Sequence, residues 1–99
     1  MSFVITQPQA LTTAAGSLAH IGSAISAQNA DVATPTTWVV PAAADEVSAL
    51  TAAVFAAHGE LYQAVSAQAT AIHQLFVATL QASAGSYAAT EDANVVAAR

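Results

Sequence analysis

The sequence predicts an all-α fold in which two long helices form an antiparallel hairpin. Aliphatic residues recur at intervals of seven in the first third of the chain, and prolines mark a break near its middle. No segment alternates between apolar and polar residues with the period of two that is typical of strands. Since 99 residues suffice for one small domain, we expect residues 1–99 to form a single domain.

The first helix is expected over about residues 8–34. Pro8 suits the first turn of a helix, where its missing N–H leaves no hydrogen bond unmade. Aliphatic residues at a strict spacing of seven predict a coiled-coil-like seam: Leu11, Leu18, Ile25 and Val32. The intermediate positions of this seam are Ala14 or Ala15, Ile21 and Gln28. Because Pro35 clashes with the preceding turn, we expect the helix to end or kink there.

The second helix is expected over about residues 42–84, after a turn at about 35–41. Pro41 is a suitable opening residue, and Asp45 and Glu46 would lie near the electropositive end of the helix. Gly85 is a candidate for the terminating residue. The tail, residues 85–99, is rich in alanine and only weakly patterned.

The second helix carries more apolar surface than the first can cover. One stripe comprises Val47, Leu50, Val54, Leu61, Val65, Ile72, Phe76 and Leu80, and a second line beside it comprises Phe55, Tyr62, Ala69 and Val77. A hairpin that buries one stripe leaves the other in water, so another chain is expected to complete a four-helix bundle. We expect the partner interface to contain Leu11, Leu18, Ile21, Ile25, Val54, Phe55, Leu61, Tyr62, Val65, Ile72, Phe76 and Leu80. A copy of the same chain or a different protein could supply the cover, and a loosely packed monomer is the alternative.

Composition argues against several classes of function. One Lys or Arg against six acidic residues gives a net charge of −5, which excludes binding to phosphate backbones or to anionic membranes through charge. Cysteine is absent. The three histidines lie too far apart or lack a nearby carboxylate, so each is expected to face solvent or a partner. We therefore expect no enzymatic activity, no metal and no cofactor.

Several segments resemble the PE family of mycobacterial proteins. The resemblance rests on Met1-Ser2-Phe3-Val4, on Pro8-Gln9, on Ala33-Thr34-Pro35-Thr36-Thr37, on the run from Val40 to Leu50, on Phe55-Ala56-Ala57-His58, on Tyr62 to Ser66 and on His73 to Val77. It covers essentially the whole chain. The Pro-Glu pair of the family reads Pro8-Gln9 here, which removes a carboxylate from a helix start, where it contributes about 0.3–1 kcal/mol.

The resemblance implies a 1:1 partnership with a PPE family protein, whose helices would complete the four-helix bundle. It further implies export by a type VII (ESX) secretion system, with an EspG chaperone that binds the PPE subunit rather than this chain. The export signal of the family, Tyr-x-x-x-Asp/Glu, corresponds to Tyr87 and Glu91. In a helix this spacing places both side chains on one face.

The expected location depends on which signal is considered. The sequence lacks the cationic start and compact apolar run of a Sec signal peptide, and it lacks the stretch of ~20 apolar residues of a transmembrane helix. Taken alone, these two absences predict a cytosolic protein. The resemblance instead implies a secreted protein at the cell envelope or in the medium. In detail the sequence most resembles substrates of the fifth ESX system. A role in host contact or in envelope transport is implied, while a self-associating structural bundle and an outer-membrane pore component stay open as alternatives.

Overall fold

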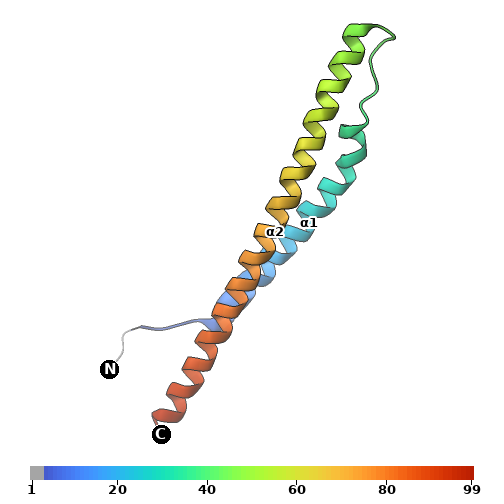
Figure 1. The fold of residues 1–99 in the computed structure, drawn as a ribbon. Helices are drawn as coiled ribbons and strands as arrows, with labels where there is room; N and C mark the ends of the chain where they lie inside the picture. Colours follow the sequence, from blue (N-terminus) through green and yellow to red (C-terminus); the bar gives the residue numbers. More distant parts are fainter. Residues whose placement is uncertain (1–3) are drawn as a thin grey trace. The chain divides into compact units, whose positions relative to one another are not determined.

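The computed structural model describes residues 4–99 and consists of two long helices joined by a loop, with no strand in that range. Helix α1 spans Pro8–Thr37 and helix α2 spans Glu46–Ala97. The helical hairpin predicted from the sequence is confirmed (Figure 1). Met1, Ser2 and Phe3, which contribute to the family resemblance, lie outside the described residues.

The end of α1 differs from the prediction, since the helix runs three residues beyond 34 and contains Pro35. Proline removes one hydrogen bond from its N–H but does not prevent the next residues from continuing the helix. The hydroxyls of Thr36 and Thr37 donate to the carbonyls of Val32 and Ala33 at 2.7 Å each. Beyond the proline the backbone pattern resumes, since the Trp38 N–H donates to the Thr34 carbonyl at 3.0 Å, and the helix therefore persists to Thr37.

The start of α2 also differs: the helix begins at Glu46, four residues after the predicted position. Asp45 caps it, because its Oδ1 accepts a hydrogen bond from the Ser48 backbone N–H at 2.8 Å and its Oδ2 accepts one from the Ser48 hydroxyl at 2.9 Å. These bonds, the backbone one foremost, hold the pKa of the Asp45 carboxyl below its ordinary value. Asp45 is therefore the N-cap, and Pro41 lies in the loop before it.

The expected stop at Gly85 is wrong, since α2 continues through it to Ala97. A glycine terminates a helix by adopting a positive φ, and no glycine among residues 4–99 does so. The segment predicted as a weakly patterned tail is thus mostly helical.

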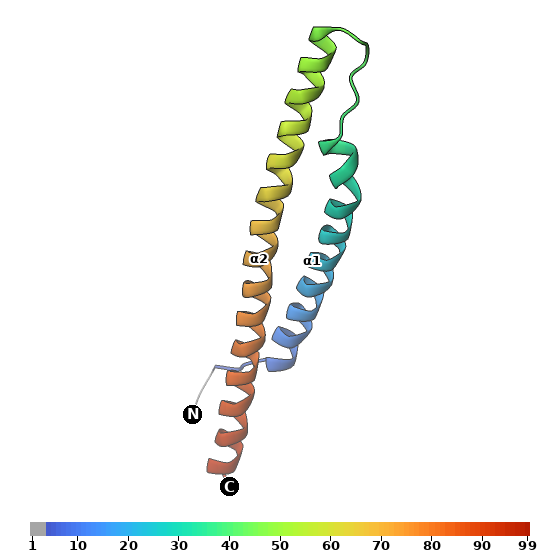
Figure 2. The same cartoon turned by 45° about the vertical axis from the view of Figure 1, so that its right-hand side comes forward.

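The hairpin comprises two units. In the first unit, residues 8–22 of α1 lie antiparallel to α2, which extends beyond the start of α1 (Figures 1 and 2). Its contact surface contains side chains that are buried or partly buried at spacings of three and four: Leu11, Ala15, Leu18 and Gly22 on α1, and His73, Val77, Leu80, Ala84, Ala88 and Glu91 on α2. His73 Nε2 lies 2.6 Å from the Leu18 carbonyl oxygen.

The second unit comprises residues 23–72 and pairs the rest of α1 with the first half of α2. Its contact surface is built from small and polar residues: Ser26, Asn29, Ala33 and Thr37 on α1, and Ala52, Ala56, Gly59, Gln63, Ser66 and Thr70 on α2. Tyr62 Oη donates to Asn29 Oδ1 at 2.7 Å, and Gln63 Nε2 donates to the Asn29 carbonyl at 2.9 Å. Polar pairing sets the register in this unit.

This arrangement corrects the expected division of the apolar surface. The sequence predicts that α1 covers one of the two apolar lines of α2, yet it covers neither. Leu61 is 64% and Ile72 is 69% exposed, whereas of both lines only Val77, at 8%, is buried. On α1, Ile21, Ile25 and Val32 are likewise exposed, although they belong to the predicted seam. In the second unit small residues occupy the seam instead, because they allow two helix backbones to approach closely.

Candidate functional site

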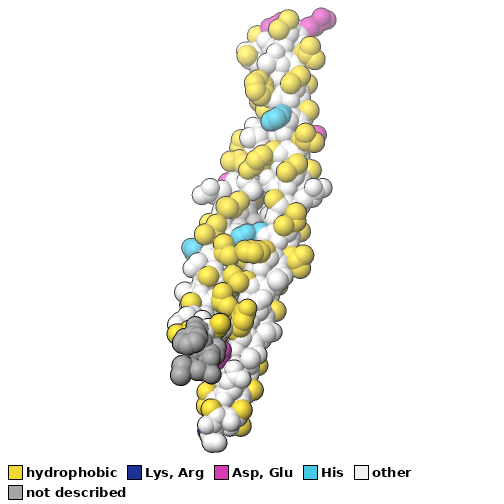
Figure 3. All heavy atoms as spheres, turned by 90° about the vertical axis from the view of Figure 1, so that its left-hand side faces the viewer, with side chains coloured by type: hydrophobic (Ala, Val, Ile, Leu, Met, Phe, Trp, Pro, Cys, Tyr) yellow, Lys and Arg dark blue, Asp and Glu magenta, His cyan; other side chains and the backbone are white. Residues whose placement is uncertain are grey.

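The main surface feature is a set of large apolar side chains that the hairpin leaves in water. On α2 they recur at spacings of three, four and seven: Val47, Leu50, Val54, Leu61, Val65, Ile72 and Phe76. At 100° per residue this line lies about 120° around the helix from the seam, so it forms a second stripe rather than the edge of the first. We call these seven residues the apolar stripe. Figure 3 shows one face of the molecule, with hydrophobic side chains along it and few acidic ones.

The twelve residues predicted for the partner interface fall into two groups. Nine are exposed: Ile21, Ile25, Val54, Phe55, Leu61, Tyr62, Val65, Ile72 and Phe76. The other three, Leu11, Leu18 and Leu80, are partly buried in the seam of the first unit. That these residues contact a partner stays a prediction for both groups. Only the side chains of the first group are exposed and could be covered by a partner without a change in the hairpin.

Sequence reasoning left some exposed apolar residues out of that interface. Val47 and Leu50 belong to the apolar stripe and are 74% and 68% exposed, and Leu75 is 69% exposed. The spacing of Val47 and Leu50 with Val54 is a signal that would have included them. Leu75 lies about 60° around the helix from Ile72, at 100° per residue, and its spacings of three from Ile72 and fourteen from Leu61 are a similar signal.

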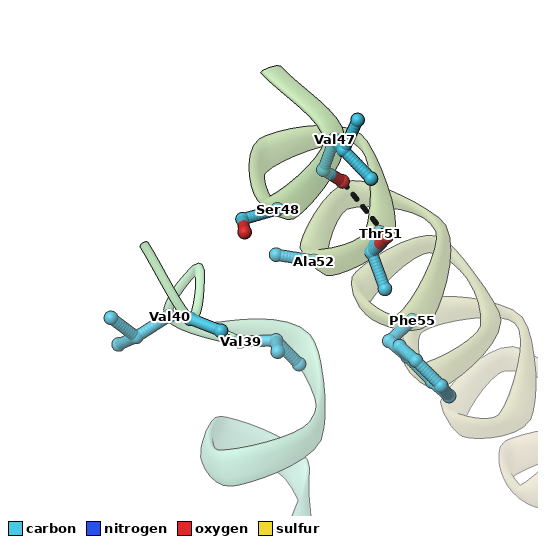
Figure 4. Close-up of a pocket in the computed structure, with 8 residues that line it drawn as sticks. Val39, Val40, Val47, Ser48, Thr51, Ala52 and Phe55 are labelled. Carbon is cyan, nitrogen blue, oxygen red and sulfur yellow. Dashed lines mark hydrogen bonds between the residues drawn. The ribbon is translucent and has the colours of Figure 1, made fainter. Parts of the chain in front are cut away.

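An open depression of about 250 Å³ lies where the loop meets the start of α2 (Figure 4). It is mostly apolar, with Val39, Val40, Val47, Thr51, Ala52 and Phe55 among its lining residues. Thr51 turns its hydroxyl to the Val47 carbonyl at 2.8 Å, so its methyl group remains for the depression. The depression continues the apolar stripe to the loop end of the second unit.

The predicted export signal lies on helix α2. Tyr87 and Glu91 are one turn apart in the helix, so both project from nearby positions on its surface. The Tyr87 side chain is 49% exposed. Glu91 is partly buried and its Oε1 accepts a hydrogen bond from Thr6 Oγ1 at 2.8 Å, across 85 residues of sequence. No sequence pattern predicts that last contact.

The histidines are differently placed from the expectation. His20 and His58 are exposed, but His73 is partly buried in the seam rather than facing solvent or a partner. Because a carbonyl oxygen only accepts, the Nε2 of His73 must carry the proton it donates to Leu18. No group of three or more His, Cys, Asp or Glu side chains suited to a metal ion occurs among the described residues. In the same range, neither helix contains a segment apolar and long enough to cross a membrane.

Comparison with known proteins places this hairpin among related sequences. The sequence model of the PE family matches residues 4–94. PE family protein PE13 of Mycobacterium tuberculosis is 63% identical over 98 residues, which are 99% of each chain. PE family protein PE8 of the same species is 57% identical over 99% of this chain and 36% of its own length. PE-PGRS family protein PE_PGRS33, also from that species, is 57% identical over 95% of this chain and 20% of its own length.

The chain thus spans nearly all of one relative and a minor part of two others. The match includes both helices and the loop between them, and so covers the apolar stripe together with Tyr87 and Glu91. On the family match and the 63% identity over almost the full length of PE13, the chain belongs to the PE family.

Proposed function

We propose that this chain is a non-enzymatic binding subunit that forms a 1:1 heterodimer with a PPE family protein and is exported with it by a type VII secretion system. The observation that carries the proposal is the apolar stripe, which is exposed along α2 while the seam of the second unit is built from small and polar residues. In this proposal an EspG chaperone contacts the complex through the PPE subunit.

The exposed area supports a large interface. The chain exposes 7563 Å², whereas a folded monomer of this mass is expected to expose about 5200 Å². The excess is larger than the roughly 800 Å² that each partner contributes to a standard interface. Burying a Phe, Leu or Ile side chain contributes about 1.5–3 kcal/mol, so the apolar stripe offers a substantial stabilisation to a partner that covers it.

The chemistry of the partner follows from the surface. Helices that present a second stripe of Leu, Ile and Phe at spacings of three and four complete a bundle with helices of the same spacing. The absence of lysine and the net charge of −5 favour a partner whose rim contains Lys or Arg. In this proposal the helices of the PPE protein supply both features.

Co-purification tests the partnership. The chain is produced alone and together with a PPE protein from the same genome, and the mass of each soluble product is measured by light scattering. We expect a soluble 1:1 complex from co-expression and an unstable or aggregating product from the chain alone. A stable monomer, or a tight homodimer that ignores PPE proteins, would contradict the proposal, the latter in favour of a self-associating structural bundle.

Export is tested separately from binding. Tyr87→Ala should remove the chain from the culture filtrate while PPE binding is retained, because Tyr87 lies 22 residues beyond Val65 and well away from the middle of the apolar stripe. Ser86→Ala is the matched control, since Ser86 is an exposed neighbour whose backbone carbonyl, not its side chain, accepts the hydrogen bond from Thr90. Normal secretion of Tyr87→Ala would exclude Tyr87 as part of an export signal.

A further inference from the structure

A side-chain hydrogen bond from Thr6 joins the segment before α1 to helix α2. The Thr6 Oγ1 donates to Glu91 Oε1 at 2.8 Å, and Glu91 is the last residue of α2 that is partly buried. Beyond it, residues 92–99 are exposed without exception. The contact therefore marks the last point along α2 at which a residue is partly buried.

The position of Thr6 is set by the start of α1. Gln7 directly follows it, and the Gln7 carbonyl accepts hydrogen bonds from the backbone N–H groups of Ala10 and Leu11 at 3.0 and 3.2 Å. Gln7 is thus the residue that begins the hydrogen bonding of α1, and Thr6 is one residue before it. A side chain so close to a fixed helix start is held more firmly than one in a free terminus.

The last turns of α2 need such a contact. Helix α1 begins at Pro8, so no part of α1 extends alongside the segment that carries Glu91. Within residues 85–97, only Ala88 and Glu91 are partly buried, and an alanine contributes little burial. A helix end without packing frays, because most helical stability in proteins comes from tertiary contacts.

We propose that Thr6 is a positioning residue for the export signal. Its hydroxyl fixes the Glu91 carboxylate and keeps the turn from Tyr87 to Glu91 helical, so that the half-exposed tyrosine ring and the carboxylate are held as one rigid pair. A hydrogen bond to an ionised acceptor is stronger than one between neutral groups, which suits a single contact that must order a whole turn. This inference rests on the proposed export function.

The chain offers matched variants for the test. Thr6→Val removes the hydroxyl but keeps the branched shape, and Thr6→Ser keeps the hydroxyl. Thr12→Val makes the same change at a threonine whose hydroxyl bonds the Pro8 carbonyl within α1, at 3.1 Å, and does not contact α2. Each variant is studied as the full chain in the soluble form in which it is purified, whether alone or in complex.

Two measurements are made on each variant. Hydrogen–deuterium exchange of residues 85–97 should be roughly 5- to 10-fold faster in Thr6→Val, since the lost hydrogen bond shifts local opening by about that factor. Thr6→Ser and Thr12→Val should exchange at the rate of the parent chain. In a Glu91→Ala background, Thr6→Val should add nothing further, because the two groups act through one bond. The fraction of the chain in the culture filtrate should fall severalfold in Thr6→Val and stay normal in the other two.

Each outcome decides the proposal. Unchanged exchange in Thr6→Val, or normal secretion despite faster exchange, overturns the positioning role while Tyr87→Ala still blocks export and the proposed function stands. Normal secretion of Tyr87→Ala overturns the export signal itself, and the positioning role with it. Faster exchange and reduced secretion that Thr6→Ser restores support the role of the hydroxyl.

Discussion

Gly22 of α1 lies against the imidazole ring of His73 of α2, with no room for a side chain between them. A Cβ atom at residue 22 would be 2.6 Å from His73 Cδ2 and 2.7 Å from His73 Nε2. The same Nε2 donates to the Leu18 carbonyl at 2.6 Å. The glycine therefore makes space for the histidine, and the histidine joins the two helices of the first unit.

Replacing Gly22 should weaken the first unit. Gly22→Ala would displace His73 from the Leu18 carbonyl, and crowding of this kind costs about 1–3 kcal/mol. Gly16→Ala is the control, because nothing lies within 4 Å of a Cβ there and both changes gain the same helix propensity of ~1 kcal/mol. We expect the free energy of unfolding, measured by urea denaturation, to be lower for Gly22→Ala than for Gly16→Ala by roughly 1–3 kcal/mol. Equal values would show that the ring moves aside without cost.

Gly59 has the corresponding place in the second unit, where a Cβ would overlap the carbonyl group of Thr36. Backbone atoms move aside less readily than a side chain, so Gly59→Ala should lower the free energy of unfolding of the hairpin by ~1–3 kcal/mol or more. Gly85→Ala should do the opposite and stabilise it by up to ~1 kcal/mol, since Gly85 is helical with open space around it. Thermal unfolding of the two variants checks both signs. If Gly85→Ala destabilised the hairpin, residue 85 would not be helical and α2 would end or bend there.

The cap at Asp45 predicts a dependence on pH. Because its pKa is lowered in the folded chain, the carboxylate contributes stability above its ordinary pKa of 3.8, and that contribution is lost as the pH falls from there through the lowered value. Asp45→Asn keeps an acceptor for the Ser48 N–H and should remove this part of the pH dependence while keeping the helix start. Amide exchange of residues 46–50 at pH 3 and pH 6 reports the difference. The same acid sensitivity in Asp45→Asn as in the parent chain would assign it to another carboxyl.

The apolar stripe and the seam should respond differently to truncation. Ile72→Ala removes an exposed side chain, so it should change the stability of the hairpin by less than ~0.5 kcal/mol but weaken partner binding by about 2 kcal/mol, or roughly 30-fold. Val77→Ala removes a buried one and should cost the hairpin about 1.5 kcal/mol. Unfolding curves and titration calorimetry on the two variants separate the effects. Full partner affinity in Ile72→Ala would place the interface elsewhere.

The sequence predicts the helical hairpin because two long segments without strand alternation flank a region of prolines. It also predicts Leu11 and Leu18 in the seam, and both are partly buried in the first unit, but it does not reveal the residues that form the seam of the second unit. The seam of the second unit consists of Ala, Gly, Ser, Thr, Asn and Gln. These residues recur with a heptad spacing, but a pattern based on large apolar residues does not include them. Leu61 and Ile72 have the stronger pattern, and they are exposed.

The helix ends show the same limit on a smaller scale. Pro41 and Gly85 are frequent helix-boundary residues, but the boundaries depend on the hydrogen bonds of Asp45 and on the φ of Gly85, which the residue type alone does not determine. Tyr87 and Glu91 were predicted from the family resemblance. The contact of Glu91 with Thr6 joins two residues 85 positions apart, and local patterns contain no information about such a pair.

The small seam has a consequence for any measurement of stability. Among the described residues, the buried hydrophobic ones are Ala15, Ala52, Val77 and Ala84, so the hairpin contains hardly any core of its own. For a chain of this kind, whatever covers the exposed stripe acts as a ligand of the folded state. The midpoint of a melting curve then rises with the logarithm of the concentration of that ligand. One melting temperature, quoted without a concentration, would describe an association equilibrium rather than a property of this chain.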